Sequence, residues 1–164
     1  MTPETYVTTI VVPTLKEALA ARGDRRLIYL ACIAVFHVID YVAEGDEGRT
    51  KKLQNEIKAR DSVAFDLLHR ACNGAKHAGG KGQKWMVPGT EREARPFGFG
   101  PECGGLDDGR WDHAGLAVTH DGQEHFLDVP AQRLLLIICQ HCATEIGPVD
   151  LSFLDPDVLA SAQP

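Results

Sequence analysis

Apolar residues recur at helical spacing through the first half of the chain and predict three helices there. The first begins at a capping box formed by Thr14 and Glu17 and ends at Gly23. The second is expected from about Asp24 to Ala43, and it is apolar nearly all round, which indicates a central position in a helical bundle. The third is expected as one long helix from about Glu47 to Ala78.

The second half of the chain begins with a segment that has no periodic pattern. Residues 79–109 are rich in glycine and proline and predict a loop. A β-hairpin is expected within residues 110–129, because two short apolar segments flank Asp121-Gly122, a favoured turn sequence. Residues 131–146 predict a last helix, although their run of Leu and Ile is also compatible with a strand. Residues 147–164 predict an acidic tail, either loose or docked.

These elements predict a single domain over residues 1–164 in the mainly α class. Its helical core comprises residues 14–78 and 130–146, a bundle of about four helices, with a small β-hairpin inserted before the last helix. Within the hairpin, we expect Leu116 and Val118 to face the core, with Phe126 opposite.

Composition narrows the classes of partner. The chain has 164 residues, of which 44% are hydrophobic, and a formal net charge of −6. An acidic surface repels nucleic acid and anionic membranes, so a polyanionic partner requires a local basic patch. The longest apolar stretch, Leu27 to Ile39, is too short to cross a bilayer. The five cysteines are an odd number and no signal-peptide pattern precedes them, so we expect a cytoplasmic protein with reduced thiols and no membrane contact.

Two polar stripes interrupt the apolar faces of the second and third helices. His37 and Asp40 share one face of the second helix, where a histidine in an apolar run requires a partner. Near the end of the third helix, Arg70, Asn73 and His77 fall within one sector of about 100°. An arginine can bind phosphate and a histidine can exchange protons at neutral pH. The stripes therefore place candidate catalytic side chains at one end of the bundle.

Two hypotheses follow from these stripes. In the first, they cleave RNA without a metal, which requires a base at the ribose 2′-hydroxyl, an acid at the leaving oxygen and cations on the phosphoryl oxygens. One helix face supplies one histidine, so a homodimer would bring two together. In the second, the stripes form an internal hydrogen-bond network in a non-catalytic binding or interaction protein. Exposure of Arg70 and His77 in a cleft would favour the first hypothesis, and burial with full hydrogen bonding would favour the second.

Arg70, six intervening residues and His77 resemble the Arg-x4–6-His motif of the HEPN superfamily. HEPN proteins are helical bundles and commonly homodimers, and many are metal-independent endoribonucleases of toxin–antitoxin or phage-defence systems, whereas others bind nucleotides or RNA only. The sequence departs from the family at Ala71, where a polar residue often follows the arginine. The resemblance implies an antitoxin or other protein partner, a catalytic pair and a supporting set. The pair is Arg70 and His77, and the supporting residues are Asn73, Lys76, His37 and Asp40.

The local charge around the predicted loop differs from that of the whole chain. From Lys76 to Pro96 there are five basic residues against two acidic ones, and Trp85 lies among them. Basic side chains can hold a phosphodiester backbone while an aromatic ring stacks on a base. The candidate RNA-binding residues are Lys81, Lys84, Trp85, Arg92 and Arg95; alternatively they form an ordinary solvated loop.

A zinc site is the remaining alternative, because Cys139 and Cys142 have the spacing of half a zinc site. Residues that would complete such a site are Cys103, His113, His120 and His125. No second tight pair is present, and cysteines in an apolar segment are most often small core residues. His120 and His125 flank the hairpin turn, where we expect them to be exposed. We therefore expect no cofactor.

Overall fold

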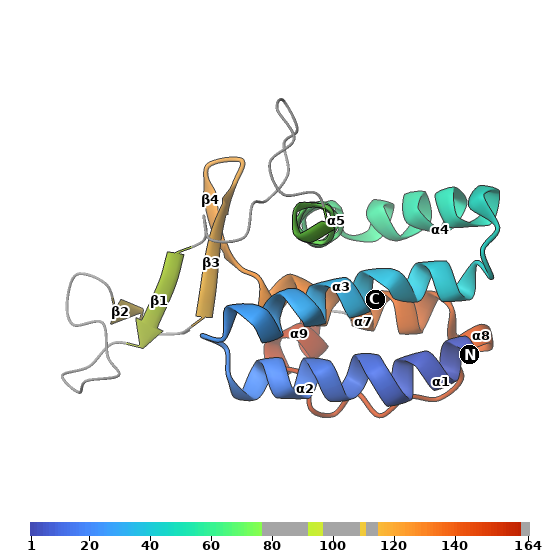
Figure 1. The fold of residues 1–164 in the computed structure, drawn as a ribbon, viewed down its shortest axis with the longest axis horizontal. Helices are drawn as coiled ribbons and strands as arrows, with labels where there is room; N and C mark the ends of the chain where they lie inside the picture. Colours follow the sequence, from blue (N-terminus) through green and yellow to red (C-terminus); the bar gives the residue numbers. More distant parts are fainter. Residues whose placement is uncertain (77–91, 97–108, 111–114, 162–164) are drawn as a thin grey trace.

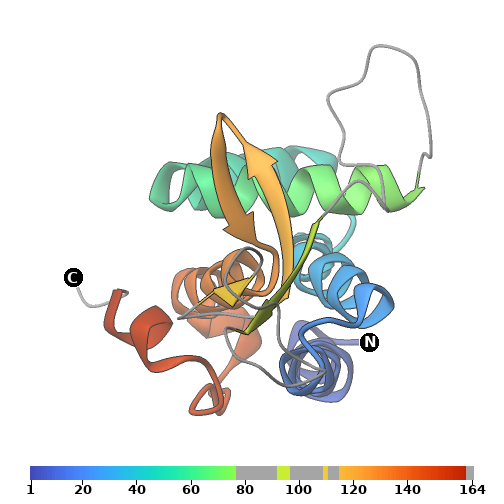
Figure 2. The same cartoon turned by 90° about the vertical axis from the view of Figure 1, so that its left-hand side faces the viewer.

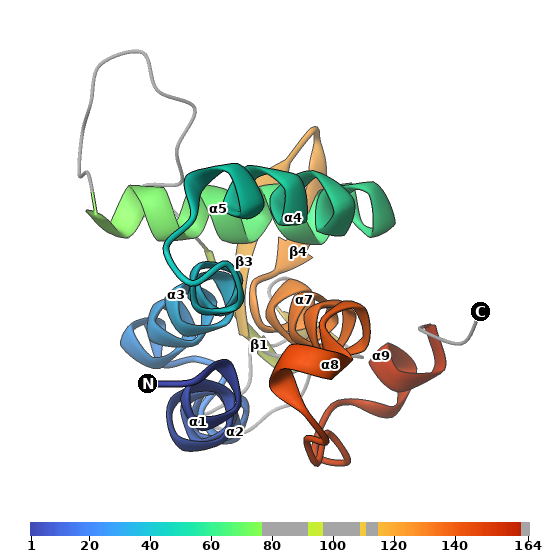
Figure 3. The same cartoon turned by 90° about the vertical axis from the view of Figure 1, so that its right-hand side faces the viewer.

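The computed structural model describes residues 1–76, 92–96, 109–110 and 115–161. Helices make up most of this part of the chain, and a small sheet stands at one end of them (Figure 1). Figure 3 shows α2, α3 and α7 nearly end-on, with α5 crossing above them. The predicted fold class, mainly α with a small hairpin before the last helices, is confirmed in these terms. No helix in the described ranges is long and apolar enough to cross a membrane.

The N-terminal helix begins earlier than the sequence predicts. Helical turns run without interruption through α1 (Pro3–Tyr6), a π-helical turn η1 (Val7–Val11) and α2 (Val12–Ala20). The Thr2 hydroxyl caps this helix by accepting a hydrogen bond from the backbone N–H of Thr5. The expected start at Thr14 is therefore wrong, because Thr2 supplies the cap and the following proline occupies the first helical position.

The second predicted helix is confirmed as α3 (Arg25–Val42). Asp24 caps it, since its Oδ1 accepts the N–H of Leu27 at 3.1 Å. It packs against α2, α5 and α7, which is the central position that its apolar surface predicts. The chain leaves it through Glu44 and Gly45, both with positive φ.

The third predicted helix is two helices, α4 (Glu47–Arg60) and α5 (Ser62–Lys76). Asp61 separates them with an extended backbone, φ −151° and ψ 91°, and its Oδ1 accepts the N–H of Ala64 at 2.9 Å. The expectation of one continuous helix is wrong because Asp61 caps a new helix that runs in a different direction. In Figure 1, α4 lies across the view and α5 is seen end-on.

The sheet is larger than the predicted hairpin. Its strand order is β2 (Gly109–Arg110), β1 (Arg92–Pro96), β3 (Gly115–His120) and β4 (Gln123–Phe126). Strands β3 and β4 are antiparallel, and β1 pairs with β3 antiparallel and with β2 in parallel. Strand β1 lies inside the segment predicted as a loop. Part of that prediction is therefore wrong, because β3 offers a second edge with which residues 92–96 pair.

The hairpin itself is confirmed. Asp121 and Gly122 have φ of 49° and 78°, so both central residues adopt the left-handed conformation of a tight hairpin turn. Leu116 and Val118 face the main core, as expected. Phe126 pairs with Ala117 and packs in a smaller cluster on the other face of the strands. Figure 2 shows this hairpin crossing α5.

The last predicted segment is helical, as α7 (Asp128–His141) and the short α8 (Ala143–Ile146), and not a strand. Its first turn contains Pro130, where the missing N–H costs little. The tail then docks through α9 (Pro156–Ser161), which packs against α7.

Hydrogen bonds among four polar side chains hold this tail against the bundle. Arg22 donates one guanidinium N–H to Asp128 and two further hydrogen bonds, of 2.7 and 2.9 Å, to the carboxylate of Asp155. Gln132 donates to that carboxylate at 2.9 Å and accepts the backbone N–H of Asp155 at 2.7 Å. We call this group, Arg22, Asp128, Gln132 and Asp155, the tail clasp.

Candidate functional site

The polar residues of α5 lie on two sides of the helix. At 100° per residue, Arg70 and Cys72 are 200° apart, so they point in nearly opposite directions. Arg70 contacts the hairpin, whereas Cys72 contacts α3. Arg70 and His37, which belong to the two predicted polar stripes, therefore lie on different sides of α5 and are not in contact.

On the hairpin side, Arg70 Nη1 lies 2.9 Å from His120 Nδ1. A guanidinium only donates hydrogen bonds, so His120 Nδ1 is the acceptor in this contact and Nε2 is the ring nitrogen left to donate. That Nε2 lies 3.6 Å from a carboxylate oxygen of Asp121. His120 is only 6% exposed, so the expectation that it is exposed is wrong. Burial is possible here because Arg70 satisfies the ring.

His125 extends this cluster along β4. It pairs with Val118, so its side chain lies on the same face of the hairpin as that of His120. The two imidazole rings meet edge-on with centroids 6.1 Å apart. Burial, followed by the neighbouring His120, lowers the pKa of His125 below its ordinary value. His125 is thus an uncharged proton acceptor at neutral pH.

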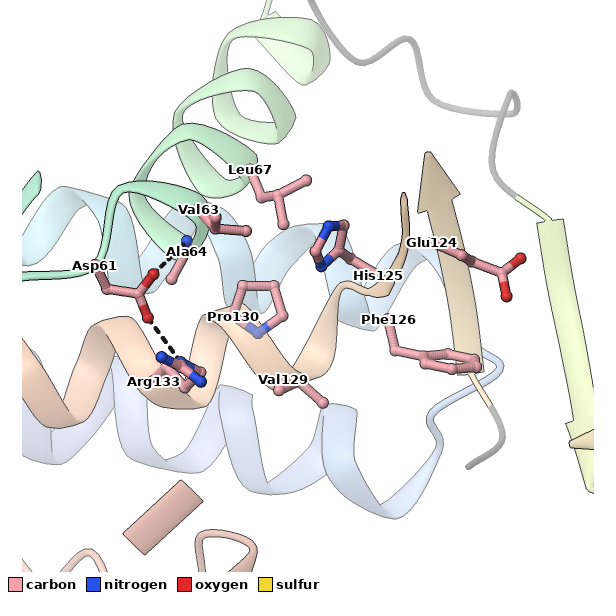
Figure 4. A pocket seen from close by; sticks show the side chains of 10 residues that line it. All are labelled: Asp61, Val63, Ala64, Leu67, Glu124, His125, Phe126, Val129, Pro130 and Arg133. Atoms are coloured by element: carbon pink, nitrogen blue, oxygen red, sulfur yellow. Dashed lines mark hydrogen bonds and ion pairs between the residues drawn. The ribbon is translucent and has the colours of Figure 1, made fainter. Parts of the chain in front are cut away.

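A cleft of about 400 Å³ opens beside His125, between α5, β4 and the start of α7 (Figure 4). Its walls are mainly apolar, and two carboxylates and one arginine lie among them. Asp61 Oδ2 accepts a 2.7 Å hydrogen bond from Arg133 Nε, while its Oδ1 caps α5. The apolar walls are Val63, Ala64, Leu67, Phe126, Val129 and Pro130.

On the α3 side, His37 is held between two groups. Its Nδ1 lies 2.6 Å from Asp40 Oδ2, and its Nε2 lies 3.8 Å from Cys72 Sγ. The sulfur is buried, so this contact lies between α3 and α5. His37 is thus partnered, as the network hypothesis expects. The role of His37 and Asp40 in supporting catalysis stays a prediction.

The other predicted site residues are placed only in part. Asn73 is half-buried on α5, and Lys76 is the last residue of that helix. Arg92 and Arg95 belong to β1. His77, Lys81, Lys84 and Trp85 lie outside the described residues. The proposed catalytic pair therefore has one described member, Arg70.

Cys139 and Cys142 are buried free thiols. Burial, and then the neighbouring Cys142, raises the pKa of Cys139 to about 12, and burial raises that of Cys142 to about 11. A zinc ligand must be a thiolate, which this apolar setting disfavours. Cys103 and His113 lie outside the described residues, within which no three metal-ligating side chains gather.

Neither Asp61 nor Arg133 is named in the sequence analysis, and His120 and His125 are named there only as residues that could complete a zinc site. Local signals exist for three of these four residues. Asp61 precedes Ser62 in a typical capping position, and the two histidines flank the hairpin turn. Arg133 has no local signal, since its partner lies 72 residues away.

Comparisons with family models, with curated proteins and with solved structures found no match to this chain.

Proposed function

We propose that this chain is a metal-independent endoribonuclease of the toxin or phage-defence type, as its resemblance to HEPN proteins implies. The observation that supports the proposal is the cluster at the hairpin side of α5. There the Arg70 guanidinium lies 2.9 Å from His120, and His125 meets His120 edge-on. A fixed cation beside two imidazoles supplies the kinds of group that phosphodiester cleavage requires.

The proposed reaction proceeds by transfer within the RNA. His125, uncharged at neutral pH, takes the proton of a ribose 2′-hydroxyl, and the 2′-oxygen attacks the adjacent phosphorus. The bond from phosphorus to the 5′-oxygen breaks, and that oxygen receives a proton from His77. Arg70 stabilises the charge on the phosphoryl oxygens. The products are a 2′,3′-cyclic phosphate and a free 5′-hydroxyl.

RNA binding and dimer formation complete the proposal. The basic residues Lys81, Lys84, Arg92 and Arg95, with Trp85, bind the RNA strand. A homodimer supplies a second copy of the cluster. No cofactor enters the reaction.

The test is incubation of a mixed RNA substrate with purified protein in EDTA, followed by resolution of the products on a gel. We expect the wild type to release cyclic-phosphate ends and both Arg70→Gln and His77→Ala to lose cleavage. Arg49→Gln is the matched control, because Arg49 forms an exposed ion pair with Glu145 away from the cluster. Unchanged cleavage by either site variant, or no cleavage by the wild type, would contradict the proposal.

A second candidate is a non-catalytic helical binding protein. The contacts of His37 with Asp40 and Cys72 favour it, because they join α3 to α5 as an internal network would. In that protein, His37→Ala and His77→Ala lower the melting temperature and change no activity. Loss of cleavage by His77→Ala at an unchanged melting temperature would exclude this candidate.

A further inference from the structure

The cleft beside His125 has the dimensions and walls of a small-molecule site. Its volume of about 400 Å³ falls in the range of ligand pockets. Val63 and Leu67 of α5 lie on one side of it, and Pro130 of α7 lies on the other. Two apolar walls of this kind suit a flat ring with apolar faces.

The charges of the cleft favour an uncharged occupant. Arg133 is the one arginine or lysine among the lining residues, and its charge is paired with that of Asp61. The Glu124 carboxylate points away from the cleft (Figure 4). His125 is uncharged at neutral pH. A phosphate placed inside the cleft would therefore find no net positive charge, whereas a neutral base needs none.

Arg133 gives the cleft its hydrogen-bonding specificity. Asp61 holds Nε at 2.7 Å and thereby fixes the plane of the guanidinium. Within the described ranges, the terminal Nη1 and Nη2 groups make no hydrogen bond or ion pair, so they offer a fork of donors. Such a fork matches two adjacent acceptors on one ring edge.

The cleft and the Arg70 cluster are neighbouring parts of one surface. His125 lines the cleft and also contacts His120, which binds Arg70. Val63, which lines the cleft, and Arg70 are seven residues apart on the same side of α5, about 10 Å at the usual rise per residue. A nucleotide whose base occupies the cleft can thus present its phosphate toward Arg70.

We infer that this cleft binds a guanine base, and that the enzyme cleaves RNA after guanosine; the inference rests on the proposed function. Guanine presents two adjacent acceptors, O6 and N7, to an arginine fork. Adenine presents an acceptor, N7, beside an amino donor, N6. That donor would point at one of the two N–H donors of the arginine fork. Pyrimidines are smaller and lack N7, so they leave the cleft incompletely filled.

Binding of the four nucleoside 3′-monophosphates to the full chain, measured by calorimetry, tests the inference without any cleavage. We expect guanosine 3′-monophosphate to bind about tenfold more tightly than the other three. Arg133→Lys keeps a cation beside Asp61 but loses the fork, so that preference should disappear. Arg60→Lys is the control, because Arg60 is exposed at the end of α4 and does not line the cleft. Melting curves verify that both variants are folded.

Equal affinity for all four nucleotides, absence of binding, or an unchanged preference in Arg133→Lys would overturn the inference. Cleavage of RNA in EDTA without preference for guanosine would overturn it too, while leaving the proposed function in place. Selective binding of the guanosine nucleotide by a protein that cleaves no RNA would have the opposite meaning. It would keep the guanine site and reject the nuclease.

Discussion

His125 shows how a single side chain acquires its chemistry from its surroundings. Nothing in the sequence near it predicts an altered pKa, since Glu124 and Phe126 flank it on a short strand. Its position beside His120 and against the cleft lowers the pKa, because both burial and a second imidazole disfavour the charged ring. The proposed base is therefore in its active form at neutral pH.

The lowered pKa of His125 makes the stability of the protein depend on pH in a definite direction. Its folded pKa lies below about 6.5, the usual value for histidine, so the unfolded chain binds the proton first as the pH falls. We expect the His125 ring resonances to titrate below pH 6.5, and the ring to contribute a loss of stability as the pH falls below that value. For the proposed enzyme, cleavage should fall off on the same acidic side.

The measurement is an NMR titration of the imidazole protons in the wild type and in His120→Gln. Removal of the second ring should move the His125 midpoint toward its usual value. A wild-type midpoint at or above pH 6.5 would show that the pKa of His125 is not lowered, contrary to what its surroundings in the structure require.

At the scale of elements, the sequence predicts the parts of the fold that depend on local signals. The apolar surface and the Asp24 cap predict α3, and Asp121-Gly122 predicts the hairpin. The corner between α4 and α5 was missed because helix-forming residues continue on both sides of Asp61. The second role of Asp61, binding Arg133, appears only once α7 is folded beside it.

The candidate site was predictable to a similar degree. Arg70 stands out from the apolar pattern of α5, so the sequence identifies it as a candidate. Its partner His120 lies 50 residues later, and helical periodicity carries no information about a contact of that range. Likewise, the pairing of His37 with Asp40 is local, whereas its contact with Cys72 depends on how α3 and α5 pack.

The hairpin turn offers a test at this scale. Gly122 has φ 78°, a conformation that glycine adopts without strain, and a Cβ added there would meet no atom within 4 Å. Gly122→Ala should lower the free energy of unfolding by about 1 kcal/mol through backbone strain alone. Gly122→Asn should cost less, since asparagine tolerates this conformation. Urea unfolding of both variants measures the difference; equal stability of Gly122→Ala and wild type would exclude strain at the turn.

For the molecule as a whole, the tail clasp joins the C-terminal tail to the turn after α2 and to α7. Asp128 is buried with 1% of its surface exposed, so removal of Arg22 takes a guanidinium from a buried carboxylate. Arg22→Ala should therefore lower the free energy of unfolding by about 3 kcal/mol. Asp155 is partly exposed, and Asp155→Ala should cost about 1 kcal/mol.

Urea unfolding followed by circular dichroism compares the two clasp variants. Lys16→Ala is a control, because Lys16 is an exposed cation of α2 that lies over the Phe153 ring and does not belong to the clasp. If Arg22→Ala costs no more than Asp155→Ala, the buried carboxylate does not depend on Arg22.

The corner at Asp61 also has a consequence for how two copies of the chain can meet. One residue separates α4 from α5, and straightening it would join them into a continuous rod from Glu47 to Lys76. The helices before the corner would then leave their own partners and pack in the same way on a second chain. Such domain swapping is a low-cost route to a dimer because it repeats native contacts. Asp61→Ala, which removes the cap, should shift the protein toward a dimer in size-exclusion chromatography, whereas Asp61→Asn should not.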